Sequence, residues 1–174
     1  MPDTNPCEFG FKRLSLNNWL TVDAAWTGVL MSLSPLPQSE GMVNDLTQMQ
    51  LDSNVPLQVR RLFETARGAL VYSVLFYPLL ALGAEQMLRV CETAASLKCE
   101  LMSAPEIWKF QQKIDWLIKY GAIAKIDEER WKFIVRMRND ASHPSDQKIY
   151  NLALALEIME LTIELIESLF VSAG

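Results

Sequence analysis

LQVRRLFETARGALVYSVLFY, residues 57–77, decides the fold because its apolar side chains recur every three or four positions. This spacing matches the turn of an α-helix and predicts one buried face, made of Val59, Leu62, Phe63, Ala66, Leu70, Val74 and Tyr77. Pro78 comes next, lacks a backbone N–H and restricts the residue before it, so a kink or a break is expected there. One long kinked helix and two separate helices both fit this sequence.

A second helical run follows Pro78 and has an apolar face and a polar face. The apolar face is predicted to consist of Leu80, Ala84, Met87, Leu88, Cys91 and Ala95. Glu85, Arg89 and Glu92 line the other face. Because Glu85 precedes Arg89 by four residues, an ion pair between these two side chains is favoured.

The next helix is predicted from the capping-box spacing of Ser103 and Glu106. Gly121 is a plausible end for it. Its inner face is expected to contain Ile107, Phe110, Ile114, Leu117 and Ile118.

Two further helices are expected before the end of the chain. Asp127 can cap the first, which Pro144 ends, and its inner side chains are Trp131, Ile134 and Val135. The second is expected to begin near Ser145 or Asp146 and to continue to about Phe170. Its carboxylates are interpreted as a solvated stripe, made of Glu157, Glu160, Glu164 and Glu167.

The first third of the chain has a different pattern. A short helix is expected over residues 22–32, and the stretch 34–41, rich in Pro and Ser, is expected to be a loop. The polar residues from there to Pro56 offer little to a core. We interpret 1–55 as an N-terminal extension of short helices and loops, and 56–174 as an all-α, antiparallel bundle of about four to six helices.

Composition favours a globular protein without a broad basic surface. Half of the 174 residues are hydrophobic and the net charge is −5, which argues against a face for gripping duplex nucleic acid. The uncharged stretch 68–84 is short for a membrane span and contains a proline, so it is interpreted as the buried centre of the bundle. Cys7, Cys91 and Cys99 lack zinc-site spacing. A cytoplasmic protein with no metal, no cofactor and no membrane partner is expected.

Residues 138–144, RNDASHP, are the segment in which catalytic or anion-binding side chains are expected. Arg138 lies next to the inner stripe of its predicted helix, where a guanidinium is costly unless it is paired or binds an anion. Arg138 and His143 are five residues apart, so they converge only if the helix unwinds at its end. Pro144 favours that unwinding because it pushes His143 out of the α region.

Arg138 to His143 resembles the motif of the HEPN superfamily: Arg, a polar residue, three more residues and His, before a final long helix. The resemblance covers roughly residues 57–170. It implies a metal-independent endoribonuclease, common in toxin–antitoxin and phage-defence systems, that acts as a homodimer with two motifs facing each other. By the resemblance, His143 is the general acid or base, Arg138 holds the phosphate, and Asn139 orients the imidazole or donates to the phosphate.

The expected site and its partners can also be interpreted without catalysis. Glu85, Arg89 and Ser142 are expected around the motif, and Arg138 can pair with Glu85 or Glu92 on a neighbouring helix. The chain would then be a non-catalytic module that binds a protein or a nucleotide. RNA, a cognate antitoxin or another protein, and a second copy of the chain are the expected partners.

Overall fold

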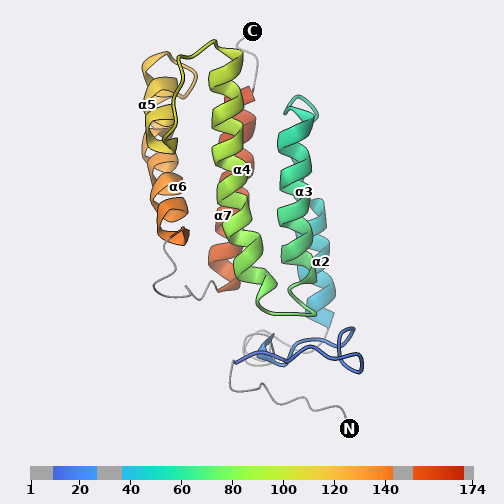
Figure 1. Ribbon diagram of the computed structural model, residues 1–174. Helices are drawn as coiled ribbons and strands as arrows, with labels where there is room; N and C mark the ends of the chain where they lie inside the picture. The colour runs from blue at the N-terminus through green and yellow to red at the C-terminus, as the bar shows by residue number, and fades with distance from the viewer. Residues whose placement is uncertain (1–9, 27–36, 143–150, 171–174) are drawn as a thin grey trace.

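The computed structural model describes residues 10–26, 37–142 and 151–170, and within them every regular element is helical. This confirms the predicted all-α bundle (Figure 1). The elements are α2 (Pro37–Gln48), α3 (Leu57–Tyr72), α4 (Leu79–Leu101), α5 (Phe110–Lys119), the short 3₁₀ helix η1 (Lys125–Asp127), α6 (Glu128–Ala141) and α7 (Leu152–Phe170). None of the helices in these ranges has the length and apolar character that crossing a lipid bilayer requires.

Helix α4 lies at the centre of the bundle and contacts α3, α5, α6 and α7. All six side chains of its predicted apolar face are buried. Several buried positions on α4 are small, namely Gly83, Ala84, Ala94 and Ala95. Small side chains let neighbouring helices approach closely, so α4 can pack against four partners at once.

Residues 57–101 form two helices, which decides between the two alternatives at Pro78. Helix α3 already ends at Tyr72, and α4 begins directly after Pro78. The Ser73 hydroxyl donates to the carbonyl of Leu70 at 2.6 Å. This bond occupies a carbonyl of the last helical turn. Pro78 is the N-cap residue of the next helix, where a missing N–H costs little.

Residues 10–26 cover the turn between α3 and α4. The buried carboxylate of Asp23 attaches these residues to the turn. The Asp23 carboxylate accepts hydrogen bonds from the backbone N–H groups of Lys12 (3.1 Å), Ala25 (3.0 Å) and Tyr77 (3.0 Å). The indole N–H of Trp26 donates to the carbonyl of Ser73 at 2.6 Å. Because Asp23 and Trp26 are almost fully buried, residues 10–26 are part of the packed structure.

The expectation of a loop over 34–41 was wrong from residue 37 onward. Helix α2 begins at Pro37, a residue whose fixed φ suits a first helical turn, and Glu40 lies near its N-terminus. Met42 and Leu46 of α2, with Val55, belong to the buried core. The polar stretch before Pro56 therefore contributes more to the core than its composition indicated. The helix expected over 22–32 lies mostly outside the described residues.

The capping-box prediction at Ser103 was also wrong. Ser103 has φ +55°, and the N–H of Ala104 donates to the carbonyl of Cys99 at 2.9 Å. A left-handed residue with this bond closes a helix C-terminus, so Ser103 ends α4 and does not begin α5. An extended link, residues 103–109, leads back beside α5, which then runs in the same direction as α4 (Figure 1). Gly121, with φ +77°, follows the end of α5 as predicted.

The last helix begins later than predicted. Asn151 lies immediately before α7, and its side-chain oxygen accepts the N–H of Leu154 at 2.8 Å, as an N-cap residue does. The carboxylate stripe on α7 is largely solvated as expected. Two of its members make contacts: Glu164 pairs with Arg130 of α6, and Glu167 accepts the N–H of Asp52 at 2.9 Å.

We expect Gly83→Ala to lower the free energy of unfolding by about 1–2 kcal/mol, because α3 and α4 touch there. A Cβ at Gly83 would lie 2.7 Å from the Leu70 side chain and 3.0 Å from the Leu70 backbone nitrogen. Gly68→Ala on α3 is the matched control, because a Cβ there meets nothing within 4 Å. It should stabilise the protein by about 0.5–1 kcal/mol through helix propensity. Urea denaturation measures both variants, and equal stability of the two would contradict this packing.

Candidate functional site

The candidate site lies where the last turn of α6 meets the middle of α4. Trp131, Ile134 and Val135 of α6 are buried as predicted, and Arg138 follows them on the same side of the helix. The Arg138 guanidinium donates two hydrogen bonds to the Glu92 carboxylate, Nε to Oε2 at 2.7 Å and Nη2 to Oε1 at 3.1 Å. Their side chains are 32% and 23% exposed. Arg138 is therefore both paired and accessible.

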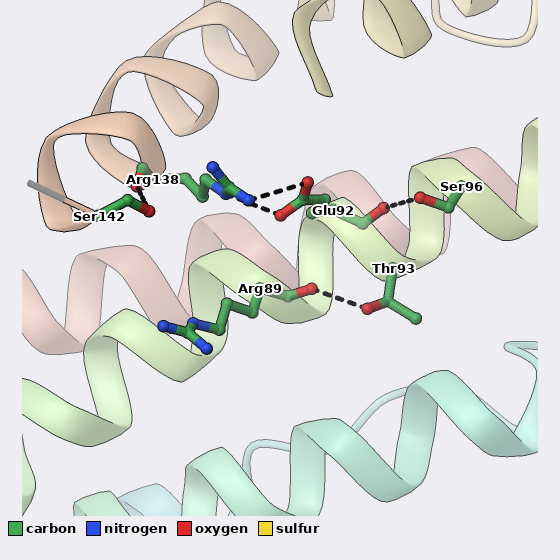
Figure 2. A pocket seen from close by; sticks show the side chains of 6 residues that line it. All are labelled: Arg89, Glu92, Thr93, Ser96, Arg138 and Ser142. Atoms are coloured by element: carbon green, nitrogen blue, oxygen red, sulfur yellow. Dashed lines mark hydrogen bonds and ion pairs between the residues drawn. The ribbon is translucent and has the colours of Figure 1, made fainter. Parts of the chain in front are cut away.

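This ion pair borders a groove of about 420 Å³. Helix α4 contributes four of the lining side chains, namely Arg89, Glu92, Thr93 and Ser96. Helix α6 contributes Arg138, and Ser142 is its C-cap residue. Figure 2 shows these side chains, with the Arg138–Glu92 pair bridging the two helices. Every lining residue is polar or charged, so the groove suits a polar ligand better than an apolar one.

The three hydroxyl groups of the groove already donate to backbone carbonyls. Thr93 donates to the carbonyl of Arg89 at 3.0 Å, Ser96 to that of Glu92 at 2.7 Å, and Ser142 to that of Arg138 at 3.0 Å. The ammonium of Lys113 on α5 donates to the Ser96 hydroxyl oxygen at 2.7 Å. Lys113 thus adds a third positive charge beside the groove.

Arg89 differs from Arg138 in its partners. Its side chain is exposed, and within the described part of the chain its guanidinium makes no hydrogen bond or ion pair. The expected ion pair with Glu85 does not form among these residues. Such exposed pairs on one helix contribute little free energy, so solvation competes well with them. Figure 2 shows the Arg89 side chain extending away from the Arg138–Glu92 pair.

The structure places part of the predicted motif. Asn139 and Ser142 are exposed at the end of α6, and the N–H of Ser142 donates to the carbonyl of Asn139 at 3.1 Å. His143 lies outside the described residues, so its convergence with Arg138 stays a prediction. Of the residues expected around the motif, Arg89 and Ser142 line the groove, whereas Glu85 does not.

Three residues of the site were missed by sequence reasoning: Thr93, Ser96 and Lys113. Thr93 and Ser96 follow Arg89 by four and seven residues, so they continue the polar face of the second helical run. That spacing could have identified them. Lys113 is on a different helix, and its proximity to Ser96 depends on how α5 packs against α4.

Comparisons with known proteins give no assignment for this chain. No family model, curated protein or solved structure matches it. Within residues 10–26, 37–142 and 151–170, no group of three or more His, Cys, Asp or Glu side chains is arranged to hold a metal ion.

We expect Glu92→Gln to lower the free energy of unfolding by about 1 kcal/mol, because it leaves Arg138 without its charged acceptor. Glu85→Gln is the matched control on the same helix, since Glu85 makes no ion pair with the described residues; it should change stability by less than about 0.5 kcal/mol. A double-mutant cycle of Glu92→Gln and Arg138→Gln, followed by urea denaturation, measures the coupling. A coupling energy near zero would show that the pair contributes nothing.

Proposed function

We propose that this chain is a HEPN-like helical protein that cleaves RNA without a metal ion and acts as a homodimer. The observation that carries the proposal is the position of Arg138. It lies at the end of α6, about a third exposed, beside a polar groove that also contains Arg89, which has no ionic partner among the described residues. A guanidinium in this setting can bind a phosphate in a bidentate manner.

The chemistry follows from the roles that the motif implies. His143 removes the proton of a ribose 2′-hydroxyl, and the 2′-oxygen attacks the adjacent phosphorus. The bond from phosphorus to the 5′-oxygen breaks, and that oxygen takes a proton as it leaves. The products are a 2′,3′-cyclic phosphate and a 5′-hydroxyl. Arg138 offsets the charge that grows on the phosphate oxygens, and Asn139 orients the imidazole or donates to the phosphate.

A dimer supplies what one chain lacks. The reaction needs a base and an acid, and the chain contains a single histidine. His143 of the partner subunit would give the second imidazole if two motifs face each other. A cytoplasmic location, a role in toxin–antitoxin or defence systems and a cognate antitoxin belong to the same proposal.

A second candidate function is a non-catalytic module that binds a protein or a nucleotide, and the Arg138–Glu92 ion pair favours it. Glu92 satisfies two of the Arg138 donors, which is what a purely structural arginine requires. In this alternative Arg138 connects α6 to α4, and the groove binds its ligand without changing it.

The test is cleavage of a mixed single-stranded RNA pool in the presence of EDTA. We expect the protein to cleave the RNA, and His143→Ala and Arg138→Ala to reduce the rate at least about 100-fold, as loss of a general acid–base group or of a group that stabilises transition-state charge does. Arg136→Ala is the matched control, because Arg136 is exposed on α6 and makes no ion pair with the described residues. Far-UV circular dichroism checks that each variant folds. Intact RNA after incubation with folded protein would refute ribonuclease activity on this pool and leave the binding module.

The oligomeric state gives an independent test. Sedimentation velocity should show a species of twice the 19.8 kDa chain mass. A monomer that still cleaves RNA would overturn the two-histidine mechanism, because one imidazole would then have to serve as both base and acid.

A further inference from the structure

The two arginines of the groove differ in whether a carboxylate compensates their charge. Glu92 compensates the charge of Arg138 through two hydrogen bonds. Arg89 lies three residues before Glu92 on the same helix, is exposed, and has no hydrogen-bonding or ionic partner among the described residues. All donors of Arg89 are thus available to a ligand, whereas two donors of Arg138 are already engaged by Glu92.

The groove is positively charged although the chain is acidic. Among its lining residues, Arg89 and Arg138 contribute two positive charges and Glu92 one negative charge, which leaves a formal charge of +1. Lys113, which is bonded to Ser96 beside the groove, adds one more positive charge. The chain as a whole has a net charge of −5. A local charge of the opposite sign draws anions to this place and away from the remaining surface.

We propose that Arg89 makes the first contact with a phosphate group of a nucleotide ligand in this groove. The proposal deepens the proposed function and rests on it for the choice of an RNA backbone as the ligand. Phosphate is the favoured anion because the planar guanidinium matches two of its oxygens at once. The hydroxyl groups of Thr93 and Ser142 donate to backbone carbonyls. Their oxygens can therefore accept hydrogen bonds from the hydroxyl or amino groups of the same nucleotide.

The division of roles between the arginines follows from this arrangement. Arg138 keeps its position through Glu92, and Arg89 makes the first contact with the incoming phosphate. The phosphate could come from an RNA backbone or from a free nucleotide, because both present the same oxygens to Arg89.

The experiment measures binding without cleavage. A fluorescein-labelled, single-stranded 2′-O-methyl oligonucleotide cannot form a cyclic phosphate, and its Kd is measured by fluorescence anisotropy at several salt concentrations; ATP is the second probe. The variants are Arg89→Gln, Arg89→Lys and Arg61→Gln. Arg61 is the matched control because it is an exposed arginine within α3, outside the groove and without an ion pair to the described residues.

We expect Arg89→Gln to weaken oligonucleotide binding about tenfold, as loss of a hydrogen bond to a charged group does. The slope of log Kd against log salt should fall by about 0.7 in this variant, because one phosphate contact is lost from a single strand. Arg89→Lys should keep the slope, since it keeps the charge. Arg61→Gln should bind as the unchanged protein does.

The outcomes separate this inference from the ribonuclease proposal. Binding of ATP alone, weakened by Arg89→Gln, would support the phosphate role and refute the RNA substrate. Binding of the oligonucleotide with equal affinity in Arg89→Gln and Arg61→Gln would overturn the role of Arg89, even if the protein cleaves RNA. Absence of binding to both probes would overturn it as well.

Discussion

Helix α4 has to bury side chains against four neighbouring helices and still present a polar face to water. Ten of its residues are buried, and several of these are glycine or alanine. Small side chains bring the helix axes together, so the contacts at Gly83 and its neighbours determine how closely α3 can approach. The side chains of α4 that its neighbours do not bury form a single polar stripe, which includes Arg89, Glu92 and Ser96. The groove exists because this one stripe is left uncovered by the packing.

The site combines a structural role and a binding role on neighbouring residues. Glu92 holds Arg138 and thereby connects α6 to α4, which fixes two lining side chains of the groove relative to each other. Arg89 makes no such connection with the residues that the structure describes, so its charge is not compensated there. A charged side chain that is solvated loses little when a ligand arrives, whereas a bridging one has part of its donors engaged already. This difference makes Arg89, which lies outside residues 138–143, the better candidate for the first contact with a ligand.

Helical periodicity predicted the existence and the inner faces of the main helices, because apolar spacing reports directly on burial. It failed at several helix boundaries, of which Ser103 and Asn151 are examples. Ser103 has a left-handed conformation that glycine usually adopts, and Asn151 rather than Ser145 or Asp146 precedes α7. The sequence left Glu85 and Glu92 equally open as partners for Arg138. The choice of Glu92 depends on how far α6 extends along α4, and no local pattern encodes this distance.

The extended link before α5 has a consequence for how this protein can vary in length. Residues 103–109 return beside α5 (Figure 1) and have no helical phase to keep. A residue added to this link would lengthen it without rotating a helix. A residue added between Trp131 and Arg138 would instead rotate Arg138 by about 100° around α6 and turn it away from Glu92. Insertions and deletions should therefore accumulate in the link, while the segment of α6 from Trp131 to Arg138 keeps a fixed length.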